Sequence, residues 1–222
     1  MRKLLIIASL FFAGATLQAQ DFKPQAGSVT TDFGLYGGIS DSELDLNEGI
    51  LRFRYFAKEN LAYRLGFGAG VYNNVDKVYG AAGEEGSRTY TDNSLTINLG
   101  IEKHFAGTNR LSPYVGADLL FGTSKETTKD ENYLNGAYSA TNNTELKGPG
   151  DISFGLRGVI GADYYIAKHL FLGAEAGLGL TYTVEGKQKT DINGITTEYK
   201  SAGNSLNLGQ GLVTAIRIGF VF

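Results

Sequence analysis

The feature that most constrains the fold is a period-two alternation between two very different sets of side chains. In the segment 62–72, one parity is apolar and the other combines arginine with glycine. The alternating residues are Tyr63, Leu65, Phe67, Ala69 and Val71 on one parity, and Arg64, Gly66, Gly68 and Gly70 on the other. Successive residues of a strand face opposite sides of the sheet, so this segment predicts a strand with one apolar face. No stretch of residues 20–222 shows helical periodicity, and this part of the chain is therefore expected to be all-β.

Eight segments carry this alternation. They are 28–36, 49–56, 62–72, 94–104, 113–122, 152–165, 170–184 and a last one from about 206 to the end. The connections alternate in length, with short turns at 57–60, 106–110 and 167–169 and longer polar connections at 37–48, 73–92, 123–150 and 185–205. Short turns at one end and long loops at the other are typical of outer-membrane barrels. We therefore expect an eight-stranded, antiparallel, up-and-down transmembrane β-barrel.

The first residues predict a cleavable signal peptide over 1–19. Arg2 and Lys3 precede a short apolar run at 4–15, and the small residue Ala19 stands at a plausible cleavage point. That run is too short for a membrane anchor, because a spanning helix needs about 20 apolar residues. The barrel domain is then expected to occupy 20–222. The chain has no cysteine, which excludes disulfides, and its formal charge of −3 without a basic cluster argues against nucleic acid as a partner.

The parity pattern alone leaves two orientations open. A soluble barrel of the lipocalin type would turn the apolar face inward around a ligand. The opposite face would then be solvated, yet it is the one that holds many of the 31 glycines beside charged residues. Glycine weakens a solvated strand, whereas inside a narrow barrel it makes room for long side chains. The composition of that face therefore favours an apolar exterior against lipid and a charged lumen.

Several segments resemble small outer-membrane β-barrel proteins of the OmpA/OmpX-like type. These segments are 54–61 followed by 66–70, 111–117, 163–170 with Gly173 and Ala174, and the final strand ending in Phe222. The resemblance covers about 27–222, and with no peptidoglycan-binding domain after the barrel we expect the barrel-only, OmpX-like form. It implies residence in the outer membrane of a Gram-negative bacterium. It also implies two partners: lipopolysaccharide around the barrel, and a barrel-assembly machinery that recognises the last strand.

Aromatic residues gather near the ends of the expected strands. Tyr55, Tyr63, Phe105, Tyr164 and Phe222 lie near the short turns, and Phe121, Phe154 and Tyr182 lie near the long connections. Such positions predict two aromatic belts, built here without tryptophan.

Nine charged residues are expected in the lumen. They are Arg52, Arg54, Arg64, Arg157 and Arg217 with Glu102, Asp118, Asp163 and Glu175. The near balance of sign favours a structural network of ion pairs over a narrow, occasionally open pore. For the last strand, we expect Arg217 to reach Glu175 and the strand to close the barrel against 29–35.

No residue is predicted to be catalytic, cofactor-binding or metal-ligating. Some small outer-membrane barrels are lipid-modifying enzymes with a Ser-His-acid site at the extracellular end. His104 and His169 fall beside short turns, at the periplasmic end, so both are expected to be interfacial polar residues. The acidic run at 41–48 has the oxygen ligands that Ca²⁺ accepts, but without EF-hand spacing it is expected to be a solvated loop.

The expected function is a structural or surface-interaction role carried by the long loops, including the polar third loop that begins near Lys125. A small-solute or lipid conduit is the alternative. An outer-leaflet lipid enzyme ranks third.

Overall fold

The computed structural model describes residues 22–38, 45–200, 203–209 and 213–222, with only the backbone described at 35–38, 45–49 and 213–215. The predicted leader at 1–19 and the side chains of the acidic run at 41–48 lie outside the described residues. The described part contains no helix long and apolar enough to span a membrane.

Twelve antiparallel strands make up one sheet over the described residues. They are β1 (Val29–Gly38), β2 (Asp45–Lys58), β3 (Leu61–Tyr79), β4 (Glu85–His104), β5 (Leu111–Leu134), β6 (Ala137–Lys147), β7 (Asp151–Ala167), β8 (Leu170–Glu185), β9 (Lys187–Ile192), β10 (Ile195–Lys200), β11 (Asn204–Gly209) and β12 (Val213–Val221). The all-β, antiparallel class expected from the alternation is confirmed.

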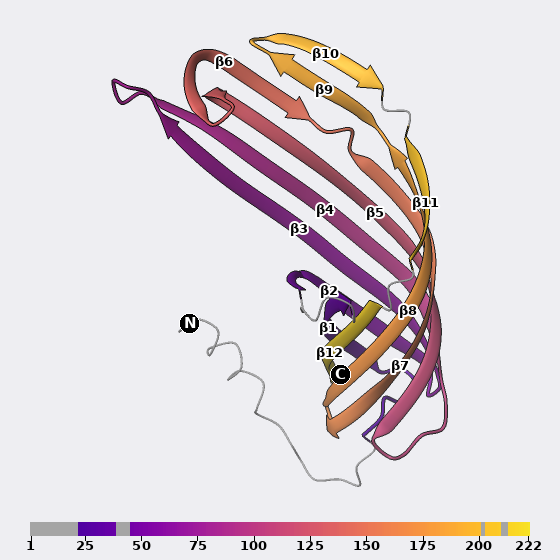
Figure 1. Ribbon diagram of the computed structural model, residues 1–222. Coiled ribbons are helices and arrows are strands. Elements are labelled where there is room, and N and C mark those ends of the chain that lie inside the picture. Colours follow the sequence, from indigo (N-terminus) through magenta and orange to yellow (C-terminus); the bar gives the residue numbers. More distant parts are fainter. Residues whose placement is uncertain (1–21, 39–44, 201–202, 210–212) are drawn as a thin grey trace.

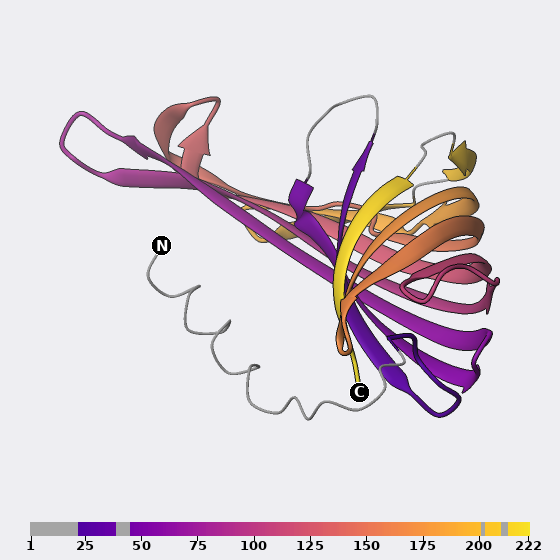
Figure 2. The same cartoon turned by 90° about the horizontal axis from the view of Figure 1, so that it is seen from below.

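Eight of these strands close into a ring in the order β1, β2, β3, β4, β5, β7, β8, β12 (Figures 1 and 2). The closing pair is β12 with β1, in register from Thr30 opposite Val221 to Gly38 opposite Val213. The expected pairing of the last strand with the amino-terminal one is therefore confirmed. Closure leaves no free strand edge within the ring, so its backbone groups find partners along the whole circuit.

The two parities face opposite sides of the ring, as the alternation predicts. On β8, Leu172 and Leu180 are exposed on the outer wall, whereas Phe171 and Glu175 are buried inside. The aromatic residues expected at the strand ends are all exposed on the outer wall. Inside, at the end of the short turns, Tyr165, Phe171 and Val221 form a small apolar cluster against which Phe22 packs.

Much of the polar sequence expected to form loops is instead sheet. β3, β4 and β5 are 19, 20 and 24 residues long and continue beyond the ring. β6, β9 and β10 extend the sheet sideways from β5. We call the part of the sheet built from 72–79, 85–92, 125–147 and 187–200 the extension; it projects to one side of the ring in Figures 1 and 2. The loop prediction was wrong because the strands of the extension are polar on both faces and lack the apolar parity that marks the ring strands.

Two tight turns mark the extension. Asn135-Gly136 joins β5 to β6, and Asn193-Gly194 joins β9 to β10, with positive φ at all four residues. Both dipeptides have the left-handed backbone of a two-residue hairpin turn, which suits the twist of the flanking strands.

The single last strand expected from about 206 is also corrected. It is two strands, β11 and β12, which both pair with β8.

Candidate functional site

The candidate site is the charged interior of the ring, to which every ring strand contributes. Asp32 comes from β1, Arg52 and Arg54 from β2, Arg64 from β3, Glu102 from β4, Asp118 from β5, Arg157 and Asp163 from β7, Glu175 from β8, and Arg217 from β12. All nine charged residues predicted for the lumen therefore face it. With Asp32 included, five arginines meet five carboxylates, so the group is balanced in charge.

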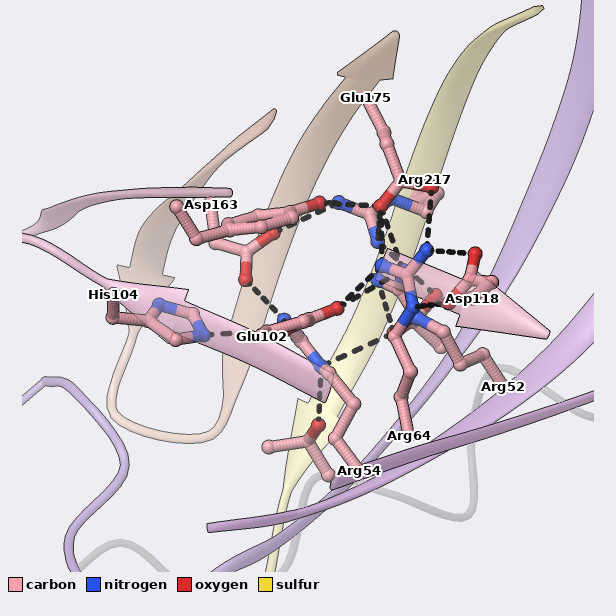
Figure 3. Close-up of polar contacts among 12 residues, drawn as sticks. Arg52, Arg54, Arg64, Glu102, His104, Asp118, Asp163, Glu175 and Arg217 are labelled. Carbon is pink, nitrogen blue, oxygen red and sulfur yellow. Dashed lines mark hydrogen bonds and ion pairs between the residues drawn. The ribbon is translucent and has the colours of Figure 1, made fainter. Parts of the chain in front are cut away.

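Two ion pairs cross the full width of the ring (Figure 3). Arg54 Nη1 lies 2.6 Å from Asp163 Oδ2, and Arg64 Nη1 lies 2.9 Å from Glu175 Oε2. β2 and β7 are four strands apart in either direction around the ring, and so are β3 and β8. These side chains therefore connect opposite walls.

Shared carboxylates join the pairs into one network. Glu102 accepts from Arg54 Nη1 at 3.2 Å and from Arg64 Nη1 at 2.7 Å. Asp118 accepts two hydrogen bonds from the Arg64 guanidinium and is also 2.6 Å from Arg157 Nη2. Because these carboxylates each contact more than one guanidinium, removing one residue weakens the pairing of several buried charges at once.

Arg217 reaches inward to an acid, as expected. Its Nη1 lies 3.4 Å from Glu175 Oε2, and its Nη2 lies 3.2 Å from Asp163 Oδ1. Nη2 also donates to the hydroxyl of Tyr114, which in turn donates to Glu175 at 2.7 Å. Glu175 is thus a partner of Arg217, although it is shared.

Inward-facing glycines make room for these side chains. A Cβ at Gly173 would lie 2.7 Å from Asp163 Oδ1 and 2.8 Å from Arg217 Nη2. A Cβ at Gly100 would collide with Asp118 and with the carbonyl oxygen of Ala117. The glycine-rich parity is therefore a packing requirement of the network, as its composition predicted.

One of the two histidines is not where it was expected. His104 is buried inside the ring, where Nδ1 is 2.9 Å from Ser112 Oγ and Nε2 is 3.2 Å from Glu102 Oε2. The prediction that His104 is an interfacial residue was wrong. His104 has the same parity on β4 as Glu102, so its side chain points into the ring. His169 is exposed at the turn after β7 and donates from Nδ1 to the Val221 carbonyl at 2.8 Å, which agrees with a place at the rim.

Sequence reasoning missed Asp32 as a member of the network. Asp32 is 3.0 Å from Arg52 Nη2, and 3.6 Å from Arg54 Nε. Its parity is opposite to that of Phe33 and Val29, so the pattern held the signal that could have found it. Among the described residues, no group of three or more His, Cys, Asp or Glu side chains is placed to hold a metal ion.

A smaller charged group lies in the extension. Arg88 on β4 makes two hydrogen bonds of 2.7 Å to Asp130 on β5, and its guanidinium stacks 4.6 Å from the centre of the Tyr133 ring. The hydrogen bonds from Arg88 to Asp130 raise the pKa of the arginine above its ordinary value. Unlike the ion pairs inside the ring, this group connects two neighbouring strands of the sheet.

Comparison with known proteins identifies the family. The model of the family described as "Putative OmpA-OmpF-like porin family" matches residues 41–222. No curated protein matches the chain. Similar solved structures include a major outer membrane protein of Thermus thermophilus, with 14% identity, 88% of this chain and 98% of that chain covered, and a TM-score of 0.49.

Two further solved structures are similar. Outer membrane protein W of E. coli has 16% identity over 89% of this chain and 99% of that chain, with a TM-score of 0.42. The N-terminal β-barrel domain of Pseudomonas aeruginosa OprF has 17% identity over 90% of this chain and 100% of that chain, with a TM-score of 0.38. The family match covers most of the chain, which belongs to this OmpA-OmpF-like porin family and is a protein of the outer membrane.

Proposed function

We propose that this protein is an eight-stranded transmembrane barrel with a sealed lumen, and that its role is structural or surface-interacting through the extension. The observation that carries the sealed lumen is the pair of ion pairs between opposite walls, Arg54 to Asp163 and Arg64 to Glu175. An eight-stranded barrel is just wide enough for side chains to fill it. Guanidinium and carboxylate groups that bridge the whole width fill it in this way.

The outer wall supports a membrane-spanning ring. On β7, the exposed aromatic residues Phe154 and Tyr164 are ten residues apart. At about 3.3 Å per residue this is about 33 Å along the strand, or about 25 Å along the membrane normal at the usual tilt. That height equals the apolar band of outer-membrane barrels. The short turns then lie in the periplasm and the extension lies outside the cell.

Conductance across a planar bilayer tests the sealed lumen. The refolded wild-type protein is expected to give no steady large conductance. Arg64→Ala, which removes a guanidinium that bridges the ring, is expected to add brief openings if the variant folds, as judged by its heat-modifiable band on a gel. Steady large conductance from the wild type would overturn the proposed sealed lumen.

A narrow pore is the second candidate, because the family is described as porin-like. Arg157, the least buried arginine of the network, would then line the path. Wild-type conductance whose ion selectivity shifts with Arg157→Gln would support the pore and contradict the sealed lumen.

We propose no enzymatic role. Ser112, His104 and Glu102 form a chain of hydrogen bonds, but Ser112 is only 5% exposed and Glu102 is held by Arg54 and Arg64. A nucleophile needs access to its substrate, and here the serine instead holds the histidine in place. A fluorophosphonate probe is expected to leave Ser112 unlabelled. Labelling that Ser112→Ala abolishes would contradict this assignment.

The extension is the proposed surface of interaction. A variant in which 72–92 is replaced by a two-residue Asn-Gly turn keeps the ring strands, because Val71 and Asn93 are directly opposite each other. Adhesion, serum survival and solute uptake of cells with this variant are compared with wild type and with a variant that lacks the β9–β10 hairpin. Loss of adhesion or serum survival alone would support surface interaction, whereas loss of solute uptake alone would support the conduit.

The last strand is the proposed signal for the assembly machinery. Phe222 is exposed at the short-turn end, and its N–H donates to the Val29 carbonyl at 2.8 Å, next to the closing pair. Deletion of Phe222 is expected to reduce the amount of folded protein in the outer membrane. Unchanged membrane yield and heat-modifiability would count against this role.

A further inference from the structure

Five lysines gather on one face of the extension. They are Lys125 on β5, Lys147 on β6, Lys187 and Lys189 on β9, and Lys200 on β10. The register places Lys147 directly opposite Lys189, and Lys200 directly opposite Lys187. Like charges directly opposite each other destabilise a strand pair. Two such pairs side by side therefore indicate that this surface, which we call the lysine patch, is stabilised by something besides the sheet.

The patch is only partly neutralised within the chain. Glu145 is 3.0 Å from Lys147 Nζ, and Glu198 is 2.5 Å from Lys187 Nζ and 3.6 Å from Lys189 Nζ. Lys125 and Lys200 form no ion pair with any residue that the structure describes. Asp191 lies on the same face, directly opposite Glu145. Five lysines against three carboxylates leave a local excess of two positive charges, and all five lysines have exposed or half-exposed side chains.

The patch shares its face with the apolar outer wall. β5 is regular from Phe121 to Lys125, and both residues have the same parity. Lys147 lies opposite Thr127, the next residue of that parity, so β6 and β9 continue the same face. The opposite face of β4 and β5 instead carries Asp92 directly across from Glu126. The excess of lysine therefore belongs to the lipid-facing side of the sheet.

The height of the patch places it at a membrane surface. Phe121, Phe154 and Tyr182 form an exposed aromatic row that is continuous in register. Lys125 is four residues beyond Phe121, about 13 Å along the strand and about 10 Å along the normal at the usual tilt. The polar headgroup layer begins where the hydrocarbon ends and is about 5–8 Å thick on each side of an ordinary bilayer. The backbone of Lys125 therefore lies just outside this layer. Lysine has a long, flexible side chain, so its ammonium group can bend back to the headgroup phosphates.

We propose that the lysine patch binds the phosphate groups of anionic lipids in the outer leaflet. This inference rests on the proposed membrane-spanning ring. Phosphates between Lys147 and Lys189, and between Lys187 and Lys200, would neutralise the two like-charged pairs. The bound lipid holds the β9–β10 hairpin and the base of the extension against the membrane surface.

Native mass spectrometry of the full-length mature protein in neutral detergent tests the proposal. The probes are phosphatidylglycerol, phosphatidylcholine and inorganic phosphate. Wild type is expected to retain phosphatidylglycerol, and Lys187→Gln with Lys200→Gln is expected to weaken retention about thirtyfold, from about fivefold for each lysine near an anionic surface. The matched control is Lys58→Gln with Lys77→Gln, which removes the same charge from exposed lysines on β2 and β3, away from the patch, and is expected to bind as wild type does.

Folding of each variant is checked by the heat-modifiable band, which separates failure of this proposal from failure of the barrel. In vesicles of phosphatidylcholine alone, the double Lys187 and Lys200 variant is expected to be about as stable as wild type, because it loses both a like-charge pair and the exposed ion pair of Lys187 with Glu198. Equal loss of phosphatidylglycerol in the control variant, equal retention of phosphatidylcholine by wild type, or binding of free phosphate without lipid would each overturn the proposal.

Discussion

The ring interior and the extension are parts of one sheet, yet their charges behave differently. β3, β4 and β5 run through both. In the interior, Arg54 and Asp163 are fully buried and join opposite walls. In the extension, Lys77 and Glu85 form a 2.7 Å pair between neighbouring strands, and each side chain is about half exposed. Closure of the sheet therefore turns an alternating charge pattern into a network; where the sheet stays open, the same kind of residues make only local, solvated pairs.

The largest expected difference between the two regions comes from removing an interior arginine. Arg54→Met leaves Asp163 and Glu102 without a shared guanidinium, and it should lower the free energy of unfolding by about 3–5 kcal/mol. Lys77→Met in the extension should change it far less, because the ion pair of Lys77 with Glu85 is solvated. Urea unfolding in lipid vesicles measures both. Adding Asp163→Leu to Arg54→Met should restore part of the loss, and equal effects of the two single variants would abolish the distinction.

A smaller effect is expected where the network needs space. Gly173→Val places side-chain atoms against Asp163 and Arg217, which should cost about 1–3 kcal/mol of unfolding free energy. Gly158→Val on β7 is the control, because nothing lies within 4 Å of a Cβ there. The same urea titration is used. If Gly158→Val proves as harmful as Gly173→Val, steric room for the network is not what the inner glycines provide.

In the extension, a backbone change should have a local effect only. Gly194 has φ of 86° at the β9–β10 turn, so Gly194→Ala should strain that hairpin by about 1–2 kcal/mol. Hydrogen exchange should show faster exchange in β9 and β10 with unchanged rates in the ring strands. Faster exchange that spreads to β7 or β8 would show that the extension and the ring open together.

The smallest expected effect is a change in the pKa of one carboxyl group in the extension, that of Glu198. A hydrogen bond from the Lys187 ammonium holds the pKa of the exposed Glu198 below its ordinary value. A lowered pKa means that this contribution to stability is present above the unfolded-state pKa and is lost as the pH falls through the folded one. NMR titration of Lys187→Gln should show the pKa of Glu198 rising toward its ordinary value. No change would mean that the pair does not form in solution.

The sequence by itself determined the ring. In each expected strand, alternate residues are mostly glycine or charged, and this pattern predicted which residues face inward, from Arg52 to Arg217. Side-chain direction in a strand depends only on whether a residue is odd or even along it. It also predicted the closing pair of the first and last strands. The hairpins of the extension were predictable too, since Asn135-Gly136 and Asn193-Gly194 are strong turn signals. They were missed because neither face of those strands is apolar.

Only the tertiary structure decided which side chains contact each other. Parity places Arg54 and Asp163 inside, but their meeting depends on β2 and β7 being opposite in a ring of eight. His104 likewise became part of the interior through Ser112 and Glu102, although its place beside a turn suggested the rim. The lysine patch needed the register of β6, β9 and β10, which joins residues from three distant segments. Local pattern sets the direction of a side chain, whereas its partner is set by how the sheet closes and in which register, and these depend on contacts far apart in the chain.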